Sequence, residues 1–138
     1  LFDFFGGLGN LSNELGTSHR YIVDSFRPDQ FQTTSNTTFI QCNLFKEKEL
    51  KKLNKQLPKH CDILILDPPR SGFKGLKKTV QQFRPQLLLY VSCHLATLVR
   101  DLQDIVQDYE IVQTELFDFF PGTFHFESFF ILKLKDSL

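Results

Sequence analysis

Short apolar runs alternate with amphipathic segments throughout this chain, and this alternation limits the fold more than any other feature of the sequence. Leucine and other apolar residues recur at helical spacing in three segments, residues 45–57, 75–83 and 96–106. The apolar runs have the length and composition of β-strands, and they cover residues 1–5, 21–23, 38–42, 62–66, 87–91, 111–116 and 128–134. Strands that alternate with helices predict an α/β protein with a mostly parallel sheet.

A glycine-rich turn follows the first apolar run, at residues 6–10 (GGLGN). Glycine permits positive φ angles and lets backbone N–H groups approach a ligand at such a turn. Two interpretations stay open, an adenosyl- or nucleotide-binding turn and a plain tight turn. Residues 11–16 then predict a short helix, and residues 26–36 predict either a short helix or an irregular connection.

Four polar residues come directly after predicted strands: Asp24, Asn43, Asp67 and Cys93. The carboxyl ends of parallel strands open onto one edge of a sheet, where α/β proteins bind their ligands. Asp24 has the position of a ribose-binding carboxylate or of a helix N-cap, and Asn43 could bind an adenine or cap its turn. The four positions together predict a ligand site at this edge.

Two of these strand ends have the more specific sequences. Asp67 opens the segment 67–72 (DPPRSG), in which two prolines hold the chain in a stiff turn that exposes the carboxylate. The alternative is a rigid loop with a structural Arg70 salt bridge. Cys93 follows the buried run 87–91, and its thiol is either a nucleophile or a packed core residue.

Phenylalanine is concentrated in the connection before the last strand, residues 117–127. Such rings stack on bases or pack in a core, and the sixteen phenylalanines of this chain favour packing. Glu127 ends the connection as either a surface carboxylate or a general base. Six lysines lie between Lys46 and Lys59; they predict a solvated helix face, with contact to an RNA backbone as the alternative.

The composition narrows the class of protein. Sixteen Lys and Arg balance sixteen Asp and Glu, so the net charge gives no argument for a polyanionic partner and excludes none. The three cysteines are odd in number and lack the spacing of zinc ligands. No apolar run approaches the roughly 18 residues of a membrane span. We therefore expect a soluble, cytoplasmic protein without a metal, and the absence of methionine predicts a fragment of a longer chain.

The motifs together resemble those of the S-adenosylmethionine-dependent RNA uracil-C5 methyltransferases of bacterial tRNA and rRNA. The resemblance covers nearly the whole chain, and the motifs occur in the family's order. It rests on residues 3–10 (DFFGGLGN), 67–72 (DPPRSG), 90–93 (YVSC) with 96–101 (ATLVRD), and 118–127 (DFFPGTFHFE). It implies an α/β three-layer sandwich with a mostly parallel, seven-stranded, Rossmann-like class I methyltransferase sheet whose last strand is antiparallel.

The resemblance also implies a role for each matching residue. Cys93 corresponds to the nucleophile that attacks carbon 6 of uracil, Glu127 to the base that removes the proton from carbon 5, and Asp67 to a residue that orients the cofactor or the uracil. The implied cofactor is S-adenosyl-L-methionine, and the implied partner is RNA, either tRNA or rRNA. The positions that match cofactor-binding residues are Phe5, Gly7, Gly9, Asn10, Asp24, Asn43 and Asp67.

Two positions depart from the family pattern. His94-Leu95 follows the cysteine where the family has Asn-Pro, and Gly6 stands where a cysteine is usual. The family's central and RNA-binding domains would precede Leu1, so we expect the fragment to be inactive by itself. Two other functions stay open: a cofactor- or RNA-binding remnant without catalysis, and a class I RNA methyltransferase that modifies another atom.

Overall fold

The computed structural model describes residues 1–119, 121–123 and 125–136, which form one seven-stranded sheet with three helices. The strands are β1 (Phe2–Phe4), β2 (Arg20–Asp24), β3 (Thr37–Gln41), β4 (Ile63–Leu66), β5 (Leu87–Ser92), β6 (Tyr109–Phe117) and β7 (Glu127–Leu134). The helices are α1 (Glu47–Gln56), α2 (Leu76–Phe83) and α3 (Leu95–Gln103). Within the described residues, none of these helices is long and apolar enough to cross a membrane.

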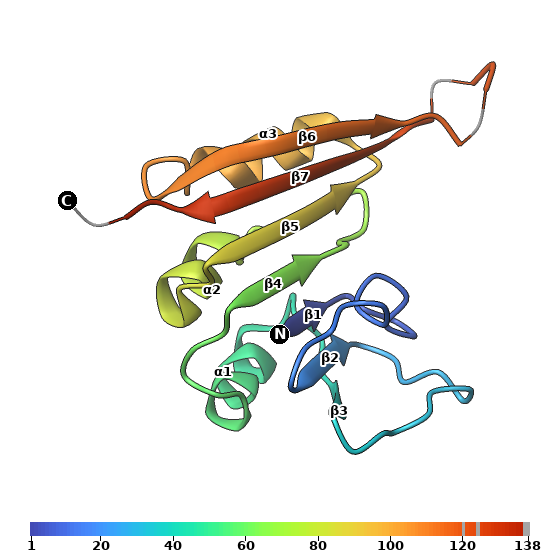
Figure 1. Ribbon diagram of the computed structural model, residues 1–138, viewed down its shortest axis with the longest axis vertical. Helices are drawn as coiled ribbons and strands as arrows, with labels where there is room; N and C mark the ends of the chain where they lie inside the picture. Colours follow the sequence, from blue (N-terminus) through green and yellow to red (C-terminus); the bar gives the residue numbers. More distant parts are fainter. Residues whose placement is uncertain (120, 124, 137–138) are drawn as a thin grey trace.

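The strands lie across the sheet in the order β3-β2-β1-β4-β5-β7-β6 (Figure 1). Strands β1 to β5 pair in parallel, and β7 is antiparallel to both of its neighbours. The predicted α/β class and the seven-stranded, mostly parallel sheet with an antiparallel last strand are therefore confirmed. The strand order reverses between β1 and β4, and α/β sheets bind ligands at the carboxyl ends of strands beside such a reversal.

All three helices pack on one face of the sheet (Figure 1). Alternate residues of each strand point to that face, so one continuous core forms between the strands and the helices. Burying a large apolar side chain stabilises a fold by about 1.5–3 kcal/mol. The side chains of this core that are at most 2% exposed include Phe2, Phe4, Leu53, Leu64, Leu66, Val80, Leu88, Tyr90 and Leu98.

The opposite face of the sheet has no helix among the described residues. Residues 5–19 cover part of this face as a loop, and the Ser12 hydroxyl in that loop donates a hydrogen bond to the buried Asp3 carboxylate at 2.6 Å. Farther along the sheet, Leu89 of β5 and Ile131 of β7 are only partly buried. The second outer layer of the predicted sandwich is therefore a loop layer in this chain.

The prediction of a short helix over residues 11–16 is wrong, because these residues form consecutive turns. The Gly9 carbonyl accepts hydrogen bonds from the backbone N–H groups of Ser12 at 3.0 Å and Asn13 at 2.8 Å. The Arg20 guanidinium donates to the Ser12 carbonyl at 2.9 Å. The same carbonyl accepts the backbone N–H of Leu15, three residues on, at 3.2 Å, so this segment closes as a tight turn that Arg20 holds from outside.

Two other connections differ from a regular helix. Residues 26–36 form an irregular connection, which is one of the two predicted alternatives. The helix predicted over residues 96–106 ends earlier, at Gln103. Beyond it, the Ile105 N–H donates to the Leu102 carbonyl at 2.9 Å, a three-residue spacing that tightens the last turn of a helix.

Candidate active site

The carboxyl ends of β1, β2, β3 and β4 surround one cavity of about 390 Å³. Four of the predicted cofactor-binding residues line it: Phe5 after β1, Asp24 at the end of β2, Asn43 after β3 and Asp67 after β4. Parallel pairing brings these strand ends together, as the sequence pattern predicts.

The glycine turn holds a strained backbone beside this cavity. Phe5 has a φ of 62° and Gly7 a φ of 52°, and a positive φ is costly for a residue with a side chain, such as Phe5. The Phe5 N–H donates to the Val23 carbonyl at 2.8 Å, which fixes the turn on β2. The Gly7 N–H donates to Asp24 Oδ2 at 3.1 Å, so the turn and the second strand end form one unit.

Gly6 and Gly9 serve the packing of the turn. A Cβ atom on Gly6 would lie 2.7 Å from Asp3 Cγ and 2.9 Å from Ile22 Cγ2, so a cysteine has no room at this position in this turn. A Cβ atom on Gly9 would lie 2.5 Å from Ile22 Cδ1. Asn10 lines a separate hollow with Arg20, so the structure does not place it with the other predicted cofactor residues.

Asp24 and Asn43 already make local hydrogen bonds. Asp24 Oδ1 accepts from the Ser25 hydroxyl at 3.3 Å and from the Phe26 N–H at 3.4 Å. Asn43 Oδ1 accepts from the Phe45 N–H at 3.0 Å, which is the turn-capping contact that the sequence left as an alternative. The Asn43 side chain still borders the cavity, so its amide nitrogen remains available to a ligand.

Asp3 is a charged residue of this region that was not among the predicted site residues. It is fully buried in β1, and its Oδ1 atom has no hydrogen-bond partner within the described residues. Burial raises its pKa to about 6, the Ser12 hydrogen bond opposes that rise, and the charges of Asp67 and Asp24 add to it. The sequence signal that indicates Asp3 is an acidic residue within an apolar run that directly precedes a glycine-rich turn.

Asp67 lies where the negative charge of this edge is concentrated. The surrounding strand ends withdraw its carboxyl partly from water although the residue reaches the surface, and this desolvation raises its pKa, with a further rise from the charge of Glu127. The charge of Asp67 also raises the pKa of Asp3, so a cation near these two carboxyl groups is favoured. Among the described residues Arg70 forms no salt bridge; its guanidinium lies 3.4 Å from His125 Nδ1.

Cys93 and Glu127 come together through the antiparallel pairing of β5 and β7. Ser92 pairs with Ser128 at the end of this ladder, and the Ser128 hydroxyl donates to the Ser92 carbonyl at 2.8 Å. Cys93 directly follows Ser92 and Glu127 directly precedes Ser128, so both residues adjoin the last pair of this ladder, one on each of its strands. Asp67 directly follows the neighbouring strand β4, and the charge of Glu127 acts on its carboxyl.

The environment of Cys93 differs from that of the other two cysteines. Burial raises the pKa of Cys42 to about 11 and that of Cys61 to about 12, so both remain protonated thiols near neutral pH. Cys93 is only partly buried. His94 is the N-cap of α3, and its Nδ1 atom accepts from the Thr97 N–H at 3.4 Å. The imidazole therefore fills the capping role after the cysteine.

The hairpin of β6 and β7 extends past the other strands at this edge (Figure 1). The prediction that its phenylalanines pack in the core is wrong for Phe117 and Phe119, which are 42% and 63% exposed. Their rings stack on each other with centroids 5.6 Å apart. The hairpin extends past the other strands, so these two rings pack against each other and not in the hydrophobic core. Phe120 and Phe124 lie outside the described residues.

Within the part of the chain that the structure describes, no group of three or more His, Cys, Asp or Glu side chains could hold a metal ion. The groups at this edge of the sheet include the Cys93 thiol, the Cys42 thiol that lines the cavity, and the carboxylates of Asp24 and Asp67.

Curated proteins with similar sequences are RNA methyltransferases. The chain is 35% identical over 139 residues to the 23S rRNA (uracil(1939)-C(5))-methyltransferase RlmD of Aliivibrio fischeri, an alignment that covers 93% of this chain and 31% of that protein. It is 40% identical over 135 residues to a Thermotoga maritima protein described as an uncharacterised RNA methyltransferase, with 93% and 30% covered. The chain thus spans less than a third of the length of these relatives.

Solved structures share the fold. The tRNA (uracil-54, C5)-methyltransferase of Pyrococcus abyssi, determined with S-adenosyl-L-homocysteine, superimposes with a TM-score of 0.63 at 22% identity and covers 95% of this chain and 33% of its own. The TYW2 protein of M. jannaschii, determined with AdoMet, superimposes with a TM-score of 0.56 at 13% identity and covers 97% and 68%. A family model for tRNA (uracil-5-)-methyltransferase matches residues 30–135. Since this match covers more than half of the sequence, the chain belongs to the tRNA (uracil-5-)-methyltransferase family.

Proposed function

We propose that this chain is the catalytic part of an RNA methyltransferase that uses S-adenosyl-L-methionine to methylate carbon 5 of a uridine. The observation that supports this proposal most directly is that Cys93 and Glu127 both adjoin the last pair, Ser92 and Ser128, of the β5–β7 ladder. Family membership supports it as well. The relatives are about three times as long as this chain, so the activity is proposed for the full-length protein.

The residues around the 390 Å³ cavity fit the cofactor. When bound, S-adenosyl-L-methionine supplies an electrophilic methyl group on a positively charged sulfonium. The carboxylates of Asp24 and Asp67 border the cavity, and the buried Asp3 adds negative charge beneath it. A cation there lowers the raised pKa of Asp3 and Asp67, which is a favourable interaction. Phe5 and Asn43 would hold the adenosine part, since an aromatic face and an amide suit a purine.

Cys93 acts as the nucleophile in the proposed mechanism. Its thiolate attacks carbon 6 of the uracil, and the electron pair of the carbon 5–carbon 6 double bond moves toward carbon 5 and the adjacent carbonyl. Carbon 5 then has the electron density needed to accept a methyl group. Covalent attachment thus divides a difficult substitution into easier steps.

Glu127 acts as the base in the second half of the reaction. It removes the proton from carbon 5, the double bond re-forms, and the thiolate of Cys93 leaves carbon 6. A base must lie near the proton that it removes, and the ladder register places Glu127 on the strand beside Cys93. Asp67 orients the uracil or the cofactor from the neighbouring strand end.

RNA is the proposed substrate, and either tRNA or rRNA fits the family. Attack at carbon 6 and methyl transfer at carbon 5 require both faces of the base to be free, so the uridine must leave its stack. The exposed pair Phe117–Phe119 stands on the hairpin beside Glu127, and an aromatic pair there can stack on a neighbouring base.

The test uses Glu127→Gln in the full-length protein with S-adenosyl-L-methionine and an in vitro RNA transcript. The mechanism requires that this variant methylate the base but fail to release it, so a covalent protein–RNA adduct accumulates. The adduct migrates as a slow band on a denaturing gel. A variant that forms no adduct and releases methylated RNA at the normal rate would show that Glu127 is not the base, and methylation of another atom would favour a different class I reaction.

A further inference from the structure

The zero net charge of the chain conceals a strong separation of charge. Residues 46–84 hold eleven of the sixteen Lys and Arg side chains but only four of the sixteen Asp and Glu side chains. Their net charge of +7 is balanced by −7 over the rest of the chain. The segment comprises α1, β4 and α2 with their flanking loops, so both α1 and α2 belong to the part of the chain that carries the excess positive charge.

A groove of about 630 Å³ runs between α1 and α2. Its apolar lining includes Leu50 and Phe73. The charged residues that line it are Lys51, Lys74 and Lys78 together with Glu47, so lysines outnumber the acidic residue. Asn54 of α1 donates to Gln82 of α2 at 2.6 Å, and both line the groove. Ser71 and Gly72, which belong to the 67–72 turn that begins at Asp67, also line the groove.

Phe45 connects the groove to the active site. It lines both the groove and the proposed cofactor cavity, and it is 55% exposed although its ring contacts Phe5 and Phe73. An exposed aromatic ring between two hollows can stack on a base or another flat group. The groove is therefore continuous with the proposed site and has both cationic and aromatic contacts.

Two of the three groove lysines have no internal role that explains their position. Lys51 pairs with Glu47 at 3.2 Å, whereas Lys74 and Lys78 form no ion pair among the described residues. Lys77 and Lys78 lie in the first turn of α2, which has no acidic residue. Cations there oppose the helix dipole, so these lysines do not stabilise α2. The sequence interpretation of a merely solvated face does not account for this arrangement.

From these observations we infer that the groove between α1 and α2 binds the phosphate backbone of the RNA substrate. Lys51, Lys74 and Lys78 contact phosphates, and Phe45 stacks on a base where the strand enters the active site. This inference rests on the proposed function, since it names the surface that holds the RNA outside the reacting uridine. A polyanion matches the charge of the groove, whereas an acidic protein segment would not need an exposed ring beside the cofactor cavity.

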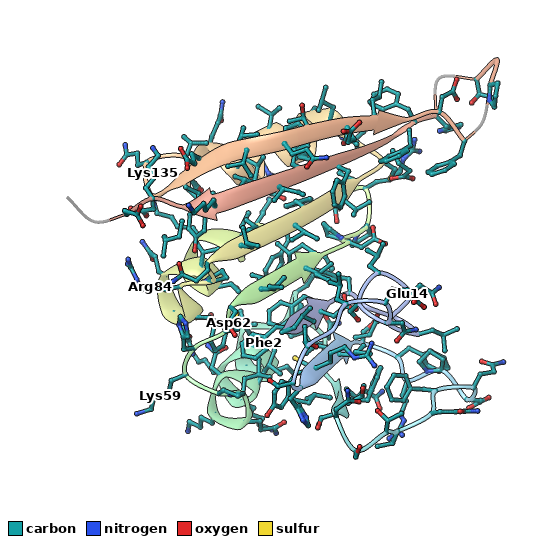
Figure 2. All side chains as sticks on the ribbon, viewed as in Figure 1. Phe2, Glu14, Lys59, Asp62, Arg84 and Lys135 are labelled. Atoms are coloured by element: carbon teal, nitrogen blue, oxygen red, sulfur yellow. The ribbon has the colours of Figure 1, made fainter. Side chains whose placement is uncertain are left out.

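The experiment compares two triple variants of the full-length protein that remove the same charge. The groove variant removes the three lysines that line the groove, through Lys51→Ala, Lys74→Ala and Lys78→Ala. The control combines Lys48→Ala, Lys55→Ala and Lys59→Ala, exposed residues on or just after α1 that do not line the groove; Figure 2 shows Lys59 projecting away from the molecule. Binding of a fluorescein-labelled transcript that contains uridine 1939 of 23S rRNA, and of a tRNA transcript, is measured over a series of KCl concentrations.

Each lost phosphate contact lowers the slope of log K against log salt by about 0.7–0.9. We expect the groove variant to lose about 2 in slope and roughly tenfold or more in affinity at physiological salt, and the control to keep most of both. Equal losses in the two variants, no loss in either, or no RNA binding by the unmodified protein would overturn the inference. If the groove variant does not fold, the single variant Lys74→Ala takes its place. Unchanged RNA binding by Lys74→Ala would overturn the inference and indicate that the groove contacts a protein.

Methyl transfer is measured separately, so the two proposals can fail separately. A protein that methylates uridine at carbon 5 while its groove variant binds RNA with an unchanged slope contradicts only the groove. A protein that binds RNA through the groove but methylates no uridine contradicts the proposed function and leaves the groove in place.

Discussion

The Tyr90 hydroxyl donates a hydrogen bond to Asp101 Oδ2 at 2.7 Å, deep in the core between β5 and α3. The same oxygen accepts the backbone N–H of Phe73 at 2.5 Å, and Arg100 donates to the other oxygen at 2.6 Å. Burial and the Asp101 carboxylate raise the pKa of Tyr90. Asp101 therefore links Phe73, in the loop after Asp67, to Tyr90 of β5, the strand that precedes Cys93. These hydrogen bonds fix the positions of two parts of the proposed active site relative to each other.

Replacing Asp101 by Asn should destabilise the protein by about 2–4 kcal/mol. The NH2 group of the amide cannot accept a hydrogen bond, so at least one of the buried donors that Asp101 now binds would lose its acceptor. Urea denaturation measures the change in the free energy of unfolding. The control is Asp104→Asn, an exposed residue just beyond the same helix, which should change stability by at most about 0.5 kcal/mol. Equal effects of the two variants would show that the Asp101 hydrogen bonds do not stabilise the fold.

Gly72 should tolerate no side chain. Its φ is +71°, and a Cβ atom would collide with the Asp101 carboxylate and the Arg100 guanidinium. Gly122 has a similar φ of +84°, but a Cβ atom there would meet no atom of the described residues within 4 Å. Gly122→Ala should therefore cost about 1–2 kcal/mol for the backbone strain alone, and Gly72→Ala about 2 kcal/mol more for the collision. Thermal unfolding of both variants gives the difference, and equal losses would contradict the steric argument.

Asp3 should make stability depend on pH. Its pKa in the folded protein is about 6, above the ordinary 3.8, so the folded state binds a proton more tightly than the unfolded state. This contribution to stability is complete below pH 3.8 and is lost as the pH rises through 6, by a total of roughly 2–3 kcal/mol. Asp3→Asn should remove this decline from urea denaturation series between pH 4 and 7.

The control for Asp3 is Asp62→Asn, since the Asp62 side chain is 85% exposed. This variant should show the same decline in stability as the unmodified protein. A decline that persists in Asp3→Asn would mean that another buried group causes it. Titration of Asp3→Asn with S-adenosyl-L-methionine should also show weaker binding if the buried charge favours the cofactor.

Cys93→Ala should reduce methyl transfer to RNA by roughly a thousandfold or more, the order of loss expected when a covalent nucleophile is removed. Binding of S-adenosyl-L-methionine, measured by calorimetry, should change little because Cys93 does not line the cofactor cavity. Cys61→Ala removes a buried thiol at the other end of the sheet, before β4, and should keep the activity. Methylation by the Cys93 variant at a normal rate would refute covalent catalysis.

Local sequence patterns were sufficient for the strands and for the strand-end residues of the proposed site. Alternation of apolar residues and the positions of prolines and glycines depend on a few neighbouring residues, so Asp24, Asn43 and Asp67 could be placed at one edge before the structure was known. The same reasoning failed for residues 11–16, where hydrogen bonds to Asp3 and Arg20 outweigh the helical spacing.

The sequence by itself determined the α/β class, the seven strands and the chemical types available at their ends, because side-chain periodicity and turn residues act over short distances. Only the tertiary structure decided which of these residues meet. The antiparallel register brings Glu127 and Cys93 to the same end of the β5–β7 ladder. The loop layer buries Asp3, and the packing of α1 near α2 gathers Lys51, Lys74 and Lys78 around one groove. These relations depend on hydrogen bonds and packing between segments far apart in the chain, which no local pattern encodes.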